Sequence, residues 1–288
     1  MPSLKEVKNR IKSVSSTRKI TSAMKLVASS KLHHAQIAIE NMLPYEQNLN
    51  KMMFSFMSEM QGDIISPYSE QRPIKKVLII AYSSNSSLCG AFNANIIKEL
   101  SKHIIELQKK GVDDIQIVPV GTKVAEKVTK MGYTFDSDNS SLIDKPNFSE
   151  ASKLAQNLMN KFKAKEIDQV IMIYNHFHST SKQVVETSNY LPIDLSSNHN
   201  GRRLATDYIV EPSKEELIAC LIPKVLHLKI YTALLDSCAS EHAARVIAMQ
   251  TATDNADELL HDLTLTYNKT RQAAITTELL DIVGGSFQ

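Results

Sequence analysis

The sequence predicts an α/β protein in which a middle domain is inserted between two long terminal helices that pair as an antiparallel coiled coil. Three observations predict this fold: heptad spacing near the C-terminus, a second long helical stretch at the N-terminus, and alternating strand and helix patterns between them. We expect three parts: an N-terminal helix at residues 1–60, an α/β domain at 74–200, and a long C-terminal helix at 209–288.

The C-terminal stretch from Ser213 to about Val283 carries the clearest pattern. Only Pro212 and Pro223 interrupt the helix-forming residues here, and no glycine lies between residues 202 and 283. A helix of about 70 residues would be roughly 105 Å long, so it must pair with another helix and project from the rest of the chain. Its expected seam follows steps that alternate three and four after the first two. The seam comprises Leu217, Leu221, Val225, Leu228, Thr232, Leu235, Ala239, His242, Val246, Met249, Thr253, Ala256, Leu260, Leu263, Tyr267, Thr270 and Ala274.

Polar residues weaken this seam. Thr232, His242 and Thr253 occupy positions where a strong coiled coil would place leucine or isoleucine. A seam with weak layers tolerates twist and close approach to other surfaces. The alternative is a scaffold helix with a mediocre core, and the pattern by itself leaves both interpretations open.

The second helical stretch runs from residue 3 to residue 42, with no glycine or proline between Pro2 and Pro44. Serines and a threonine at residues 13–17 weaken its pattern, because their side chains compete for backbone hydrogen bonds. We expect a local irregularity there, and a kink or short interruption at Pro44 before the helix resumes through residue 60. Its expected seam comprises Leu4, Val7, Ile11 and Val14, then Ile20, Met24 and Val27, and later Ala35, Ile39 and Met42.

The two ends of the chain carry charges of opposite sign. Residues 1–36 hold eight Lys or Arg against Glu6 alone, whereas the chain from Asp254 onward holds six acids against Lys269 and Arg271. Opposite charges favour antiparallel pairing of the terminal helices. A nucleic-acid surface is the competing interpretation of the basic face, but no aromatic residues are interleaved with the basic ones.

The middle of the chain changes pattern. Short apolar runs at residues 75–82, 115–121, 168–177 and 182–190 predict strands, and residues 91–110, 122–131 and 149–164 predict helices, with Ser149 as an N-cap. This alternation is typical of a Rossmann-like domain with a parallel core and helices on its faces. Linkers at 61–73 and 196–203 bound it.

The composition of the chain narrows the classes of protein to which it can belong. Apolar content of 43% and charged content of 22% are ordinary for a soluble protein. The sequence contains no apolar run of 18 residues, so it predicts no membrane span. The basic N-terminus lacks the features of a secretory signal. Three cysteines, far apart and without metal-ligand spacing, suit a reducing compartment.

Candidate chemistry on this chain is weak. The loop from Ser83 to Gly90 follows the first strand, where phosphates bind in doubly wound folds, but it matches no phosphate-binding motif, so a structural turn is favoured. Cys89 has no evident catalytic partners. His176 and His178 have no acidic residue or cysteine nearby in sequence to complete a metal site. We therefore expect no catalytic residue, cofactor or metal on this chain.

Both ends of the chain resemble the gamma subunit of F-type ATP synthases. The resemblance rests on residues 3–11 (SLKEVKNRI), 17–28 (TRKITSAMKLVA), 248–256 (AMQTATDNA) and 267–276 (YNKTRQAAIT), the last of which is highly specific. It covers the whole length, strongly at the ends and weakly in the middle. The family's loop Ser-Asp-Arg-Gly-Leu-Cys-Gly-Gly is altered here, with Asn85, Ser86 and Ser87 in place of Asp-Arg-Gly and Ala91 in place of the last glycine.

The resemblance implies a rotor shaft for ATP synthesis coupled to hydrogen ion transport. The paired helices would lie inside a head of three alpha and three beta subunits, and the α/β domain would lie against the epsilon subunit and the membrane ring of c subunits, in a complex that also contains delta. Catalysis would belong to the beta subunits. With no transit peptide, we expect a peripheral protein on the cytoplasmic face of a bacterial inner membrane. The rival class is a coiled-coil scaffold with an α/β ligand-binding domain.

The resemblance also implies which residues touch the head. Met24 and Lys25 match the segment that faces the beta subunits. The remaining positions are polar contacts near the head's catch regions and an apolar tip, and the alternative for each is that it only pairs the two helices. These positions are Arg245, Arg271, Gln272 and Thr276, followed by Ile282 and Val283 at the tip.

Overall fold

The computed structural model describes residues 3–59, 66–112, 114–135, 139–193, 210–211 and 213–285. They divide into two compact units. The helix-pair unit combines Met1–Ser30 with Arg245–Gln288, and the α/β unit is Lys31–Ala244. Helix α1 (Leu4–Glu59) and helix α6 (Lys214–Gly285) contribute to both units. The predicted domain boundaries at 60, 200 and 209 and the loop 196–203 lie outside the described residues.

Helix α1 begins with a capping box. The Ser3 backbone N–H donates to Glu6 Oε2 at 2.9 Å, and the Glu6 N–H donates to Ser3 Oγ at 3.3 Å. Each bond satisfies a backbone donor that the first helical turn would otherwise leave unpaired. The cap therefore fixes the start of the helix at the position that the sequence predicts.

Helix α1 runs without a break from Leu4 to Glu59, so the expected irregularity at residues 13–17 and an interruption at Pro44 do not occur. The hydroxyls of Ser16 and Thr17 donate to the carbonyl oxygens of Lys12 and Ser13 within the same helix, at 3.0 and 3.2 Å. These side chains are thus accommodated without breaking the backbone ladder. The helix also continues through Pro44, which is an interior residue of α1.

The seam of α1 also differs from the prediction. Leu4, Val7, Ile11 and Val14 are buried or half-buried, and the stripe continues in phase through Thr21, Lys25, Ala28 and Leu32. The position between Val14 and Thr21 is taken by Arg18, which is exposed. Ile20 and Val27, predicted on the seam, are 60% and 58% exposed. Ile20 and Val27 each lie one residue before the position that continues the earlier seam. The helix keeps the phase of that seam, so these two side chains point away from it.

Helix α6 begins where the sequence predicts. Ser213 caps it, since the Glu216 N–H donates to Ser213 Oγ at 3.2 Å; Pro212 lies outside the described residues. Pro223 is an interior residue of the helix. Of the predicted seam, every residue from Leu217 to Thr270 is buried or half-buried, and Ala274 is exposed. In the α/β unit the helix also buries neighbouring faces, as at Leu234 and Cys238.

The α/β unit contains a four-stranded sheet in its described part, with the strand order β2-β1-β3-β4. The strands are β1 (Lys76–Tyr82), β2 (Asp114–Val120), β3 (Gln169–Ser179) and β4 (Lys182–Leu191). β1 pairs in parallel with β2 and β3, whereas β3 and β4 are antiparallel. The parallel core and its four strands confirm the predicted fold class.

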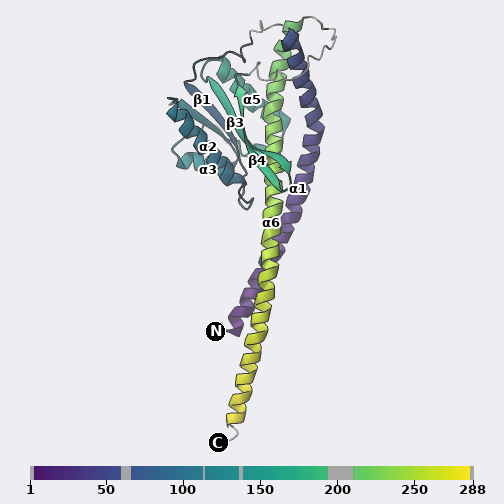
Figure 1. Cartoon of the computed structure of the whole chain (residues 1–288), viewed down its shortest axis with the longest axis vertical. Helices are drawn as coiled ribbons and strands as arrows, with labels where there is room; N and C mark the ends of the chain where they lie inside the picture. The colour runs from purple at the N-terminus through teal and green to yellow at the C-terminus, as the bar shows by residue number, and fades with distance from the viewer. Residues whose placement is uncertain are drawn as a thin grey trace. The chain divides into compact units, whose positions relative to one another are not determined.

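Helices cover both faces of this sheet (Figure 1). α2 (Phe92–Lys109) and α3 (Thr122–Lys130) bury one apolar cluster against β1, β2 and β3. α5 (Phe148–Lys163) and α6 bury the other cluster on the opposite face. The sequence missed the short helix α4 (Ser141–Asp144). It also misplaced the cap of α5, because Asn147 accepts from the Ser149 N–H.

One window of α6 has a mean hydropathy of 1.6, which is apolar enough by length and composition to cross a membrane. Half of that window is buried within the structure. Such burial is typical of a core helix in a folded protein, because the apolar side chains already have protein neighbours. The window therefore gives no reason to place α6 in a membrane.

Candidate partner interface

Polar contacts join α1 and α6 within the helix-pair unit. Arg18 Nη1 lies 2.8 Å from Asp257 Oδ1. The hydroxyls of Thr21 and Thr253 lie 2.9 Å apart. Lys25 Nζ donates to Gln250 Oε1 at 2.6 Å. Residue numbers that rise along α1 meet numbers that fall along α6, so the two helices are antiparallel, as the opposite charges predict.

These contacts contribute little stability. The Arg18 and Asp257 side chains are 46% and 52% exposed. An exposed ion pair of this kind is worth about 0.2–1 kcal/mol. Apolar seam residues such as Val7, Met249, Ala256 and Leu263 are buried instead. The polar contacts therefore fix the register of the two helices, whereas the apolar residues hold them together.

Large apolar side chains remain exposed on the α1 part of this unit. Ile20, Leu26 and Val27 are 60%, 66% and 58% exposed. Single exposed apolar residues are ordinary, but here three such side chains occur within eight residues of one helical segment. The sequence prediction missed this surface because it placed two of these residues on the seam between the helices.

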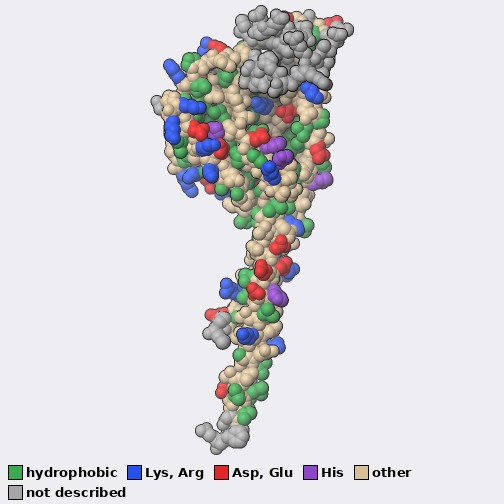
Figure 2. All heavy atoms as spheres, viewed as in Figure 1, with side chains coloured by type: hydrophobic (Ala, Val, Ile, Leu, Met, Phe, Trp, Pro, Cys, Tyr) green, Lys and Arg blue, Asp and Glu red, His purple; other side chains and the backbone are tan. Residues whose placement is uncertain are grey.

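The last described turns of α6 are exposed on every side. Each described side chain from residue 271 to residue 283 is exposed, including Arg271, Gln272 and Thr276. Thr276 donates its hydroxyl to the Gln272 carbonyl oxygen of its own helix. Ile282 and Val283 are 69% and 52% exposed. Figure 2 shows hydrophobic side chains gathered near this end of the helix.

The other predicted interface residues have neighbours within the unit. Lys25 is half-buried and bonds Gln250, so it pairs the two helices. Met24 is half-buried, and Arg245 is 8% exposed. The structure therefore separates the predicted set into exposed residues on the last turns of α6 and residues that also pack within the helix pair.

The loop from Ser83 to Gly90 is filled by its own hydrogen bonds. Ser83 Oγ accepts from the Val124 N–H at 3.0 Å, and Asn85 Oδ1 accepts from the Thr122 N–H at 3.0 Å. The Ser84 carbonyl oxygen accepts from the Lys123 N–H at 3.1 Å. These donors are the N-terminal amides of α3, so this turn joins the end of β1 to the start of α3.

Close packing reinforces this turn. Gly121 has a φ of 106°, and a Cβ placed there would lie 2.2 Å from the Ser83 carbonyl oxygen. Cys89 is 1% exposed, and the Asn93 amide donates to its Sγ at 3.2 Å. This thiol is therefore enclosed by the fold, and solvent does not reach it.

His176 and His178 lie on strand β3, which extends to Ser179, two residues beyond the predicted end at residue 177. Asp236 of α6 is close to His176, with 2.5 Å between Oδ2 and Nδ1, and its Oδ1 accepts from the Phe177 N–H at 2.7 Å. Sixty residues separate His176 from this acid, so spacing in the sequence gave no signal of the pair. No group of three or more metal-ligating side chains occurs among the described residues.

The fold and these contacts define a class of protein, namely a coiled-coil protein that carries a Rossmann-like α/β domain. A family model described as ATP synthase matches residues 3–287. The ATP synthase gamma chain of Bacteroides thetaiotaomicron is 56% identical over 100% of both chains, and that of Bacteroides fragilis is 57% identical over 99% of each. This chain belongs to the ATP synthase gamma-chain family.

Solved structures share the fold at lower identity. A chain of the Euglena gracilis mitochondrial ATP synthase rotor aligns with a TM-score of 0.63 at 18% identity, over 94% of this chain and 98% of that one. A chain of the Tetrahymena thermophila mitochondrial ATP synthase central stalk and c-ring aligns with a TM-score of 0.59 at 24% identity, over 81% and 99%. These likenesses support the fold class.

Proposed function

We propose that this chain is the central rotor shaft of a proton-transporting F-type ATP synthase. The observation that carries the proposal is the exposed apolar surface of the helix-pair unit, in a chain of the gamma-chain family. Ile20, Leu26, Val27, Ile282 and Val283 expose apolar area that a surrounding protein would remove from water. A head of three alpha and three beta subunits is the proposed surrounding protein.

In this proposal the chain works by differential contact. The two helices present unlike side chains around their circumference, so each beta subunit meets a different face of the shaft. Rotation of the c-ring then moves each beta subunit through states of different nucleotide affinity. The free energy passes between sites because each state makes different contacts. The catalytic residues belong to the beta subunits.

The proposal extends to the other partners and to location. The epsilon and delta subunits and the c-ring complete the complex, and the chain lies peripherally on the cytoplasmic face of a bacterial inner membrane. A coiled-coil scaffold with a ligand site in the loop after β1 is disfavoured, because that loop already bonds the α3 amides through Ser83 and Asn85.

Substitutions on the last turns of α6 test the coupling role. We expect Arg271→Ala and Gln272→Ala each to lower proton-driven ATP synthesis by about fivefold, the effect of about 1 kcal/mol of coupling. Both side chains are exposed, so folding should change little. The measurement is ATP synthesis in vesicles that carry the assembled complex.

The matched control is Gln108→Ala, the same substitution at an exposed position on α2. It should leave synthesis unchanged. Wild-type rates in both α6 variants would remove Arg271 and Gln272 from the coupling surface. A loss in the control as large as in Gln272→Ala would show a general effect on assembly.

A further inference from the structure

The outer side of helix α2 carries a row of exposed lysines around one exposed isoleucine. The residues of this row follow the first at four, seven and eleven positions, so they lie on one side of the helix. That side is opposite to the one whose apolar residues, such as Leu100 and Leu107, are buried against the sheet. We call this row the lysine face of α2, and it comprises Lys98, Lys102, Ile105 and Lys109.

Positive charge dominates this part of the α/β unit. Residues 92–110 and 122–130, which are α2 with its C-cap and α3, contain seven lysines, no arginine and three glutamates. Two of these glutamates pair with a lysine of their own helix at 3.0 Å. Within the described part of the chain, Lys98 and Lys109 form no ion pair. The two segments therefore carry a formal charge of +4, against +2 for the whole chain.

The lysines of α2 and α3 belong to one surface. Both helices cover the same side of the sheet, where they bury one apolar cluster and contact each other. Figure 2 shows basic side chains along the part of the α/β unit where Figure 1 places these two helices. The exposed Lys127 and Lys130 of α3 therefore add their charge to that of the lysine face.

Ile105 gives the lysine face an apolar centre. Its side chain is 51% exposed, and it lies between Lys102 and Lys109 along the helix. Lysines around an exposed apolar side chain are typical of a helix at a membrane surface, because the charges attract anionic headgroups and the apolar group enters the acyl boundary. Nucleic acid fits less well, since Phe92, the one aromatic residue of α2 and α3 apart from His103, is buried and cannot stack on a base.

The basic stretch of α1 has different neighbours. Acids of α6 lie beside it within the helix-pair unit, as in the pair between Arg18 and Asp257 at 2.8 Å. An approaching anionic surface would meet these acids together with the basic residues, and the two effects oppose each other. The lysine face of α2 therefore offers the better charge match to an anionic surface.

We propose that the lysine face of α2 binds the surface of a membrane that contains anionic phospholipids. The ammonium groups of Lys98, Lys102 and Lys109 lie among lipid phosphates, and the Ile105 side chain enters the boundary between headgroups and acyl chains. This docking surface is distinct from the helix pair. It needs none of the partner subunits proposed above, because the lipid alone supplies the opposite charge.

Flotation of the purified full chain with lipid vesicles tests the dependence on lipid charge. One set of vesicles is phosphatidylcholine alone, and the other contains equal parts of phosphatidylcholine and phosphatidylglycerol. We expect binding to the anionic vesicles to be about tenfold or more tighter, since each lysine near an anionic surface adds to the binding constant. This binding should weaken as the salt concentration rises. Equal binding to both sets of vesicles would overturn the proposal.

Glutamine variants locate the contact. Each lysine contributes about fivefold to binding, so Lys98→Gln combined with Lys109→Gln should weaken binding to the anionic vesicles by about 25-fold. The matched control is Lys153→Gln combined with Lys224→Gln, which removes two exposed lysines from α5 and α6. It should bind like the wild type. Equal losses in both double variants would show dependence on net charge alone and would overturn the proposed face. Circular dichroism confirms that each variant is folded.

A single tryptophan identifies the surface that enters the lipid, because the chain has no tryptophan of its own. Brominated lipid in the anionic vesicles should quench the fluorescence of Ile105→Trp. Leu26→Trp, at an exposed position of α1, should show no quenching that depends on lipid charge. Charge-dependent quenching of Leu26→Trp as large as that of Ile105→Trp would place the contact on α1 and overturn the proposal. Tighter binding of the wild-type chain to a DNA duplex than to the anionic vesicles would overturn it as well.

Discussion

At the scale of single residues, the His176–Asp236 pair links strand β3 to helix α6. Burial lowers the pKa of His176, but the hydrogen bond and the charge of Asp236 together outweigh burial and raise it above its ordinary value. The pair joins residues 60 positions apart and also satisfies the Phe177 N–H. It therefore fixes how β3 lies against α6 within the α/β unit.

The pair gives a pH dependence of known sign. Because the folded pKa of His176 is raised, its contribution to stability is complete below the unfolded pKa of about 6.5 and is lost as the pH rises through the folded value. Asp236→Asn should lower the pKa of His176, since the remaining large effect is burial. An NMR titration of the His176 ring measures it, with Glu150→Gln, which removes an exposed acid of α5, as the control. An unchanged pKa in Asp236→Asn would contradict this assignment.

Two glycines with positive φ differ in the space around them, so alanine should cost different amounts of stability at the two positions. Gly121 and Gly132 both have positive φ values, of 106° and 86°. A Cβ at Gly121 would meet the Ser83 carbonyl oxygen at 2.2 Å, whereas a Cβ at Gly132 would meet nothing within 4 Å. We expect Gly132→Ala to cost about 1–2 kcal/mol from backbone strain alone. Gly121→Ala should cost about 1–3 kcal/mol more.

Denaturant unfolding of the two glycine variants checks this prediction. Both substitutions add the same methyl group, so a larger cost at Gly121 reflects the contact with Ser83 together with the backbone conformation of Gly121, which has φ 106° and ψ 147°. Equal costs would mean that the turn after β1 moves freely away from α3. That outcome would contradict the rigid loop inferred from the Ser83 and Asn85 hydrogen bonds.

At the scale of elements, the phase of helix α1 decides which of its leucines are buried and contribute to the free energy of unfolding. Leu32 of α1 is 6% exposed and packs against Ala239 and Ala243 of α6. Leu26 of the same helix is 66% exposed. We expect Leu32→Ala to lower the free energy of unfolding by about 2–5 kcal/mol, because it leaves a cavity in the seam. Leu26→Ala should change it by less than about 0.5 kcal/mol.

The two leucine variants form a matched pair, measured by the same denaturant unfolding followed by circular dichroism. Similar losses in both would show that the exposed surface around Leu26 is covered within the chain itself. Such a result would also weaken the case for a partner on that surface. A loss confined to Leu32→Ala supports the described seam.

The sequence predicted the elements better than their details. The strands, the long helices and the antiparallel pairing followed from periodicity and charge, which are local or summed properties. Ile20 and Val27 were misassigned because the apolar residues shift phase there, while the helix stays in register with Arg18 and Thr21. Asn147 rather than Ser149 caps α5, since both are good caps and only the backbone geometry distinguishes them.

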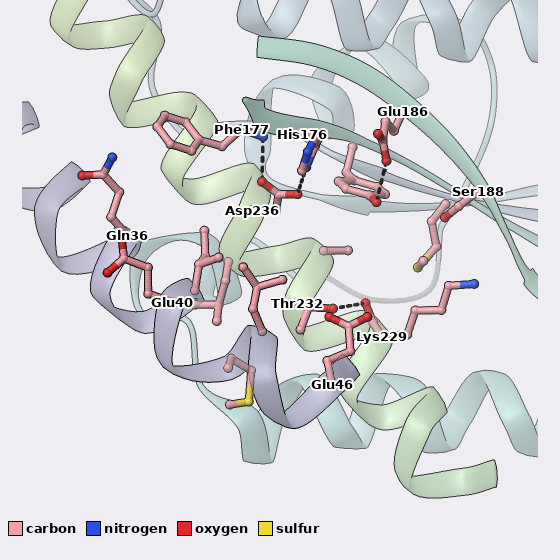
Figure 3. A pocket seen from close by; sticks show the side chains of 17 residues that line it. Gln36, Glu40, Glu46, His176, Phe177, Glu186, Ser188, Lys229, Thr232 and Asp236 are labelled. Carbon is pink, nitrogen blue, oxygen red and sulfur yellow. Dashed lines mark hydrogen bonds and ion pairs between the residues drawn. The ribbon is translucent and has the colours of Figure 1, made fainter. Parts of the chain in front are cut away.

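Sites formed by distant residues could not be predicted in the same way. A cavity in the α/β unit is lined by side chains of α1, β3, β4 and α6 (Figure 3), so its residues lie as far apart in the sequence as Glu46 and Asp236. A resemblance supplied the interface residues, and the structure adds that Arg271, Gln272 and Thr276 are exposed while Arg245 is 8% exposed.

At the scale of the whole molecule, the two units differ in which side chains they expose and which they bury. The helix-pair unit has exposed apolar and polar side chains that suit an enclosing head, and the α/β unit contains most of the buried core. A shaft of this kind needs no catalytic residues of its own. In the proposed function, this role depends on partner subunits that bind both units of the chain.

Co-purification tests that claim most directly. The chain is expressed with its cognate alpha and beta subunits, and the stoichiometry and ATPase activity of the eluted species are measured. We predict one copy of this chain for every three alpha and three beta subunits, with ATPase activity in the complex and none in this chain alone. A chain that elutes by itself, with or without activity of its own, would contradict the rotor account.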